Sequence, residues 1–248
     1  MNYLLTIDSS NATNTGDVTI SFSPPIDTRG LQYNLGMCRL DMSYSWYNIT
    51  SLNNTFKYNN GSADRTLTIS PGCYSFQNLV SEIHDLMILE GDVTVVSSVN
   101  TFDINLSLDL SNGYTSLILT NSYTVDFTGL GIRSIFGFNS AVYNTSTVSP
   151  NKSDITNRIS TVLVHCDLTA GHSYKNSNSN DVIYSFKVNA QENETFSIEP
   201  SYVRFLPINT RSSVNSLRVY MTDQSGNVLN LQGYPFTCEL MLEPILNY

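Results

Sequence analysis

Three histidines are the first residues to consider as catalytic or metal-binding groups, because imidazole serves both roles near neutral pH. They are His84, His165 and His172. His165 precedes Cys166 in a strand-like apolar run, and alternation along a strand places these two side chains on opposite faces of a sheet. This arrangement disfavours joint metal binding, so we expect His165 to be a packed strand histidine. His84 falls near the polar side of a predicted helix and should be solvated.

Other signatures of catalysis are weak. The sequence contains no Gly-x-Ser-x-Gly elbow, phosphate-binding loop, dinucleotide fingerprint or metalloprotease histidine pair. Asp223, Ser225 and Asn227 resemble the start of a calcium loop, but the segment is too short and lacks the distal glutamate, so it predicts a turn. A pair of facing carboxylates for glycoside hydrolysis stays open. We predict a non-enzymatic protein with no catalytic residues, no metal site and no cofactor.

The four cysteines indicate packing and not chemistry. Cys38, Cys73, Cys166 and Cys238 match no zinc-ligand spacing. The first residues contain neither a basic stretch nor a long apolar run, which predicts a chain that is not secreted through a signal peptide. In a reducing compartment, such as the cytoplasm or nucleus, these cysteines are expected to be small buried hydrophobes.

The aromatic residues are the clearest candidates for binding. In an extended segment, Tyr44 and Trp46 share one face and Tyr47 lies on the other. An exposed Tyr/Trp patch marks a subunit interface or a sugar-binding platform, whereas core packing of Trp46 is the alternative. The apolar segment 243–248 is a second contact-prone region, unless it docks onto its own domain. The candidate interface residues are Tyr44, Trp46, Tyr47, Ile245, Leu246 and Tyr248.

The elements that must position these residues are mostly short strands. Alternating or apolar β-branched runs are separated by Gly, Pro and Asn, at intervals that are typical of a sandwich or jelly roll. Pro24 and Pro25 should end the second strand. Gly226 should provide positive φ in a hairpin turn after 216–222. The predicted strands are 3–8, 17–23, 32–42, 55–58, 65–69, 93–96, 101–108, 115–119, 123–127, 161–167, 182–188, 195–198, 202–207, 216–222 and 235–242.

One segment predicts a helix instead. Ser75 can cap it, and Gly91 lies where a C-terminal cap belongs. Its apolar residues fall on one helical face, and polar residues occupy the other, which predicts an amphipathic surface helix over about residues 75–90. We expect this helix to lie on a sheet, although a role in binding a partner stays open. The apolar face consists of Phe76, Leu79, Val80, Ile83, Leu86 and Met87.

The 248 residues allow one large β domain or two smaller ones. Residues 139–157 have a loop-like composition, which suggests a boundary between a β-sandwich half at 1–140 that carries the helix and a second half at 141–248. The alternative is one jelly roll with an inserted subdomain. The polar segment 171–181 has no apolar anchor and is expected to be an exposed, mobile loop.

The charge of the chain limits its partners. Only 13% of residues are charged, and the net charge of -9 would repel nucleic-acid phosphates. No apolar run approaches the length of a membrane span. A polar surface made of Asn, Ser, Thr and Tyr suits wet contacts between proteins. We therefore expect neither direct nucleic-acid binding nor membrane insertion.

Several segments together resemble a known family. They are MSYSWYNI at 42–49, NNTFKY at 53–58, PGCY at 71–74, SIFGF at 134–138, TVLVHCDL at 161–168 and the hairpin 216–242. Their order and spacing are similar to those of the jelly-roll minor capsid, or penton, proteins of Polinton/Maverick elements and of related adintovirus-like and virophage-like viruses. The resemblance implies a virion protein with a jelly-roll fold, without catalysis or cofactor, that forms a homopentamer and contacts a major capsid protein. A glycan- or receptor-binding β-sandwich is the second hypothesis, and a glycosidase is the third.

Overall fold

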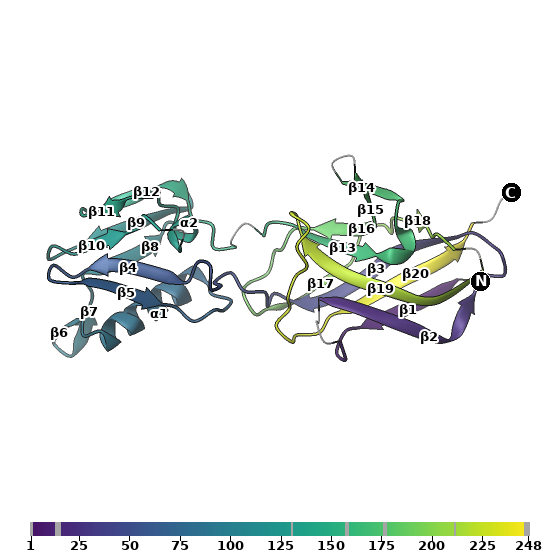
Figure 1. The fold of residues 1–248 in the computed structure, drawn as a ribbon, viewed down its shortest axis with the longest axis horizontal. Coiled ribbons are helices and arrows are strands. Elements are labelled where there is room, and N and C mark those ends of the chain that lie inside the picture. The colour runs from purple at the N-terminus through teal and green to yellow at the C-terminus, as the bar shows by residue number, and fades with distance from the viewer. Residues whose placement is uncertain are drawn as a thin grey trace. The chain divides into compact units, whose positions relative to one another are not determined.

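The computed structural model describes residues 2–12, 16–129, 131–156, 159–175, 178–210 and 212–245 (Figure 1). It divides into two compact units. Unit 1 consists of Met1–Trp46 and Ile159–Tyr248, and unit 2 consists of Tyr47–Arg158. Unit 2 is therefore an insertion between two parts of the sequence that fold together. The predicted boundary at 140/141 instead falls inside unit 2, so the observed division follows the topology of a domain with an inserted subdomain.

Among the described residues, unit 1 contains two large antiparallel sheets, one of five strands and one of four, and a small two-stranded hairpin. Sheet A has the order β1-β20-β3-β17, and sheet B has the order β16-β13-β19-β2. A short strand, β18 (Leu206–Pro207), also pairs with β3. The eight main strands are β1 (Tyr3–Asp8), β2 (Asp17–Asp27), β3 (Tyr33–Ser43), β13 (Val162–Cys166), β16 (Val182–Phe186), β17 (Thr195–Ile198), β19 (Ser213–Asp223) and β20 (Thr237–Pro244).

The pairing of these strands defines the fold. Among the eight, the first pairs with the last (β1 with β20), the second with the seventh (β2 with β19), the third with the sixth (β3 with β17) and the fourth with the fifth (β13 with β16). This nested pairing is that of a long hairpin wrapped into two sheets, which is a jelly roll. The predicted all-β, jelly-roll-type architecture is therefore confirmed for unit 1.

The core of unit 1 lies between the inward faces of its two sheets. On β20, Cys238, Leu240 and Leu242 are buried and alternate with less buried residues, as the period of a strand requires. On β19 and β13, Val219 and Val164 are fully buried. The rings of Phe186 in β16 and Phe196 in β17 meet edge-to-face at 6.0 Å between centroids, which joins sheet B to sheet A on one side of the sandwich.

Strand β2 does not end at Ser23, as was predicted from Pro24 and Pro25, but continues to Asp27. The reason is its position at the edge of sheet B, where a proline that lacks an N–H group can be accommodated. The register with β19 shifts between Val214 and Ser216, so the proline segment is accommodated as an irregularity in the pairing.

Unit 2 is a second β structure with its own core. One sheet has the order β11-β10-β4-β5, a second has the order β12-β9-β8, and β6 and β7 form a separate hairpin. Two helices accompany them, α1 (Phe76–Leu89) and the short α2 (Arg133–Phe136). The strands are β4 (Thr55–Asn59), β5 (Asp64–Thr68), β6 (Thr94–Val96), β7 (Val99–Thr101), β8 (Ile104–Leu108), β9 (Tyr114–Leu119), β10 (Thr124–Asp126), β11 (Val142–Tyr143) and β12 (Thr147–Lys152).

The predicted amphipathic helix is confirmed as α1. The Ser75 hydroxyl accepts a hydrogen bond from the backbone N–H of Asn78, and Gly91 adopts a left-handed conformation with φ of 79° after the last turn. The backbone N–H groups of Gly91 and Asp92 donate to the carbonyl groups of Ile88 and Met87, which completes the C-terminal cap. The buried residues Phe76, Leu79, Ile83 and Met87 pack into the core of unit 2.

Two predicted loops are strands instead. Segment 139–157 contains β11 and β12, which pair with β10 and β9, so the prediction of an irregular boundary there is wrong. Segment 171–181 contains the hairpin of β14 (Ser173–Lys175) and β15 (Asn178–Asn180), preceded by a 3₁₀ turn at Asp167–Thr169. Both segments are rich in Asn, Ser and Thr, and they owe their strand conformation to pairing and not to apolar patterning.

In the described part of the chain, neither helix is long and apolar enough to span a membrane.

Candidate interface surfaces

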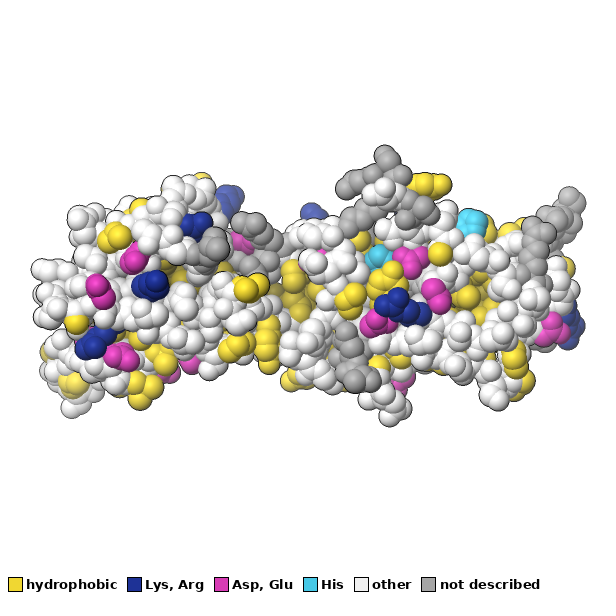
Figure 2. Space-filling model, viewed as in Figure 1, with side chains coloured by type: hydrophobic (Ala, Val, Ile, Leu, Met, Phe, Trp, Pro, Cys, Tyr) yellow, Lys and Arg dark blue, Asp and Glu magenta, His cyan; other side chains and the backbone are white. Residues whose placement is uncertain are grey.

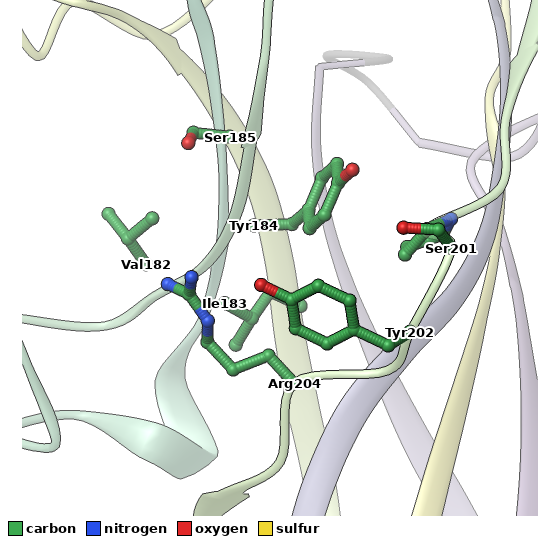
Figure 3. A pocket seen from close by; sticks show the side chains of 8 residues that line it. Val182, Ile183, Tyr184, Ser185, Ser201, Tyr202 and Arg204 are labelled. Atoms are coloured by element: carbon green, nitrogen blue, oxygen red, sulfur yellow. The ribbon is translucent and has the colours of Figure 1, made fainter.

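A hollow of about 230 Å³ lies along the edge of sheet B, between β16 and the segment that leads from β17 to β18 (Figure 3). Strand β16 is the last strand of its sheet, so within the described residues its outer edge has no strand partner. Such an edge presents backbone groups that a neighbouring chain can pair with. We call this site the tyrosine–arginine hollow; it is lined by Val182, Ile183, Tyr184, Ser185, Pro200, Ser201, Tyr202 and Arg204.

The tyrosine–arginine hollow carries an exposed aromatic ring and an exposed cation. Tyr202 is 71% exposed, Arg204 is exposed, and Tyr184 is half-buried. Figure 3 shows the Tyr202 hydroxyl and the Arg204 guanidinium extending in the same direction from their segment. Arg204 forms no ion pair with any residue that the structure describes, whereas Arg39 and Arg218 each bind an aspartate. The hollow therefore offers an uncompensated guanidinium, which prefers a carboxylate partner.

A second hollow, of about 660 Å³, lies on the other side of unit 1, where the edge strands β1 and β2 come together. Asp17 is engaged there by Arg218 through two hydrogen bonds, Nε to Oδ1 at 2.8 Å and Nη2 to Oδ2 at 2.5 Å. Asp8 is exposed, and among the described residues its carboxylate accepts a hydrogen bond only from the backbone N–H of Ser10. We call this site the acidic hollow; it is lined by Asp8, Asn11, Ala12, Asp17, Val18, Thr19, Ile20 and Arg218.

The remaining charges are dispersed. On the face drawn in Figure 2, Lys and Arg side chains lie apart from one another, several of them beside Asp or Glu, and most of the surface is uncharged. The Arg39 side chain binds Asp41 at 2.8 Å, and Arg65 binds Asp92 at 3.2 Å. On the face drawn in Figure 2, this distribution differs from the continuous basic stripe that is typical of a nucleic-acid surface.

The predicted aromatic patch at 44–47 is mostly internal. Tyr44 and Trp46 are 4% and 3% exposed, and their rings lie 4.4 Å apart between centroids. Strand β3 ends at Ser43, so the segment is not an extended strand with alternating faces. Core packing, the alternative interpretation of Trp46, is what the structure shows. Of the three residues proposed as interface contacts in this segment, Tyr47, which is 37% exposed, keeps substantial exposed surface.

The C-terminal candidates are described only in part. The backbone N–H of Ile245 donates to the carbonyl oxygen of Gln32 at 2.8 Å, and the Ile245 side chain is half-buried. The segment thus begins by docking onto its own domain, as the alternative expected. Leu246 and Tyr248 lie outside the described residues, so their role as contacts stays a prediction.

His165 belongs to a buried polar network on β13 and β19. Its Nδ1 lies 2.7 Å from Asp181 Oδ1, its Nε2 lies 2.9 Å from Thr222 Oγ1, and its ring stacks on Tyr220 at 4.4 Å. Burial would raise the pKa of Asp181, but hydrogen bonds from His165 and Tyr220 outweigh it and lower that pKa. Thr222 is 2% exposed, so this Asp–His–Thr arrangement has no accessible hydroxyl for nucleophilic catalysis. The contacts are those of a packed strand histidine.

His84 is half-buried and packed, and not a solvated surface residue as predicted. Its ring stacks on Phe102 with 3.9 Å between centroids, and Nε2 lies 3.0 Å from the carbonyl oxygen of Ile104 at the start of β8. Burial lowers the pKa of His84. The side of α1 that contacts neighbouring residues is wider than its apolar stripe, and His84 lies on this wider side.

The cysteines are free thiols, and the segment that resembles the start of a calcium loop forms a turn. Cys166 and Cys238 are fully buried free thiols, and burial raises the pKa of Cys166 to about 12. Cys38 and Cys73 are half-buried. In the turn after β19, Asp223 accepts hydrogen bonds from the backbone N–H groups of Ser225 and Asn227, so this segment is a turn, as predicted. Among the described residues, no cluster of three potential metal ligands occurs.

Sequence patterns did not identify either hollow. Tyr184 and Arg204 are 20 positions apart, and their segments meet only because β16 and the β17–β18 connection lie at the same edge of the jelly roll. Asp8 and Asp17 come together in the same way through β1 and β2. The usable signal was the pair of residue types at positions 202 and 204, since tyrosine and arginine are each enriched in protein interfaces.

Comparison with known proteins supports the fold over the whole chain. No protein-family model matches the sequence, and no curated protein matches it. A solved structure, the crystal structure of the SeMet-labelled mavirus penton protein, matches with a TM-score of 0.55 and 12% sequence identity. The match covers 99% of this chain and 100% of the other. At this level of identity the match shows a shared fold.

Proposed function

We propose that this chain is a non-enzymatic structural protein of a virus or of a virus-derived mobile element, and that it acts as a penton-like minor capsid protein in the virion. The observation that carries this proposal is the full-length fold match to the mavirus penton protein. The resemblance of segments such as 42–49 and 161–168 to Polinton-type capsid proteins agrees with it. Unit 2 is then a subdomain inserted into a single jelly roll.

The proposed mechanism is assembly. Each copy of unit 1 has open sheet edges on two different sides, β1 with β2 and β17 with β16. When one side of a subunit meets the other side of the next, the contact is heterologous, and repeated heterologous contacts form a ring when the rotation between subunits closes. We propose that the ring is a homopentamer and that it contacts a major capsid protein. This role assigns the chain no catalytic step, cofactor or nucleic-acid contact.

Light scattering of the purified full-length chain, alone and with a candidate major capsid protein, tests the proposal. The expected result is a particle of five copies that also binds the capsid protein. A monomer that ignores this partner would count against the vertex role. Thermal unfolding in the same buffer serves as a control, because it shows that the chain is folded when its mass is measured.

A further inference from the structure

We propose that the tyrosine–arginine hollow and the acidic hollow are the two halves of one contact between copies of this chain. The inference rests on the proposed function, since it names the surfaces through which subunits would associate. It deepens that function by assigning Tyr202 and Arg204 on one copy, and Asp8 on the next, to the same interface.

Position in the fold is the first argument. The tyrosine–arginine hollow lies at the β16 edge of the jelly roll, and the acidic hollow lies at the β1/β2 edge. These edges lie on different sides of unit 1, because β16 and β2 are opposite ends of sheet B. A contact between two different surfaces of identical subunits is heterologous, which is the kind that closes a ring.

Charge is the second argument. Arg204 is exposed and forms no ion pair with the described residues, within a chain of net charge -9. Asp8 is exposed on the opposite side, and among described residues its carboxylate accepts a hydrogen bond only from a nearby backbone N–H. The Arg218 guanidinium in the same hollow is paired with Asp17, which leaves the Asp8 carboxylate without an ion pair among the described residues. Complementary charges steer subunits together and select the correct surfaces, whereas like charges in the same place oppose association.

The side chains of the tyrosine–arginine hollow supply the third argument. Tyr and Arg are enriched among residues that dominate binding energy in interfaces. Tyr202 exposes 71% of its surface, and Arg204 and Tyr184 line the same hollow. Strand β16, which is an edge strand among the described residues, forms one wall of the hollow, and an edge strand can pair with a second chain (Figure 3). A second copy fits these features because its acidic hollow carries the exposed carboxylate of Asp8 beside the edge strands β1 and β2.

Charge reversal of the full-length chain tests the contact, with sedimentation velocity over a range of concentrations as the readout. Arg204→Asp should weaken self-association at least tenfold because it places two carboxylates together. Asp8→Arg should weaken it similarly, and the double variant should recover most of the lost association. Tyr202→Ala should also weaken it, whereas Tyr202→Phe should retain association.

Matched controls separate the contact from general effects of charge and folding. Arg133→Asp makes the same charge change at another arginine without an ion pair among the described residues, in unit 2, and should leave association unchanged. Circular dichroism should show the same folded spectrum for every variant. Wild-type-like association of both Arg204→Asp and Tyr202→Ala would overturn the proposal, and so would a double variant that remains as weak as the singles. A monomeric wild-type chain would instead refute the proposed assembly function itself.

Discussion

At the scale of single residues, a buried carboxylate connects the end of α1 to the first sheet of unit 2. Asp92, which follows α1, accepts hydrogen bonds from the Tyr58 hydroxyl at 2.6 Å, the Asn60 amide at 2.7 Å and Arg65 Nε at 3.2 Å. Its side chain is 7% exposed. The residue thus ties the end of the helix to β4 and β5, and each donor would lose its partner if the carboxylate were removed.

We expect Asp92→Asn to lower the free energy of unfolding by about 2–3 kcal/mol at pH 7, because it leaves buried donors facing an amide. Burial raises the pKa of Asp92, but the Tyr58 and Asn60 hydrogen bonds and the Arg65 charge outweigh it and lower that pKa. The stabilisation is therefore complete above the ordinary carboxyl pKa of about 4 and is lost as the pH falls through the lower folded value. Urea unfolding of wild type and variant should show a difference that shrinks in acid; a constant difference would contradict this. Asp85→Asn, at an exposed position of α1, is the control.

At the scale of elements, the end of α1 allows the cost of a left-handed backbone conformation to be measured without a steric clash. Gly91 has φ of 79°, and a Cβ atom built there would meet nothing within 4 Å. Gly91→Ala should therefore destabilise unit 2 by about 1–2 kcal/mol through left-handed strain alone. Gly129 also has open space around it but no positive φ, so Gly129→Ala should be neutral or slightly stabilising. Chemical denaturation of the two variants checks this, and equal stabilities would show that the cap contributes nothing.

The same helix shows why some elements could be predicted from the sequence. Ser75, the apolar stripe and Gly91 are signals that lie within or beside the helix itself. The helix can therefore be recognised from a short stretch of sequence. Strands β11 and β12 have no such signal, because their stability comes from partners 15 or more residues away in β10 and β9. The predicted end of β2 at Pro24 failed for a related reason: whether a proline is tolerated depends on the edge position of the strand, which only the assembled sheet defines.

The candidate site shows the same limit more strongly. The aromatic cluster at 44–47 was visible in the sequence, but burial of Tyr44 and Trp46 follows from tertiary packing that alternation could not predict. Tyr202 and Arg204 gave no pattern of their own, since their significance comes from the neighbouring edge of β16. Composition and strand patterning predicted the class of fold, whereas the surfaces proposed as contacts depend on long-range pairing.

At the scale of the whole molecule, long-range pairing also determines where the chain can be divided. Strand β1 pairs with β20, and β2 pairs with β19, so both ends of the sequence are needed to complete unit 1. In unit 2, the fully buried Asn48 side chain donates to the carbonyl oxygens of Tyr74 and Ile155, both at 2.7 Å, and so joins the beginning of the inserted segment to its end. The buried hydrophobic cluster of unit 2 draws its members from residues 49–138, all within the insertion.

We therefore expect residues 47–158, expressed alone, to fold with a cooperative thermal transition, because the core, both sheets and the Asn48 clasp are complete within that segment. A chain in which a short Gly/Ser linker replaces 47–158 should likewise fold, since β3 and β13 would stay in one jelly roll.

Fragments 1–140 and 141–248 are the matched comparison. Cutting there separates β12 from β9 and β1 from β20, which exposes the buried faces of both units, and these fragments should aggregate or remain unfolded. Circular dichroism melts and amide proton NMR dispersion distinguish the two divisions. Cooperative folding of 1–140 together with failure of 47–158 would show that the chain consists of two sequential halves and not of a jelly roll with an insertion.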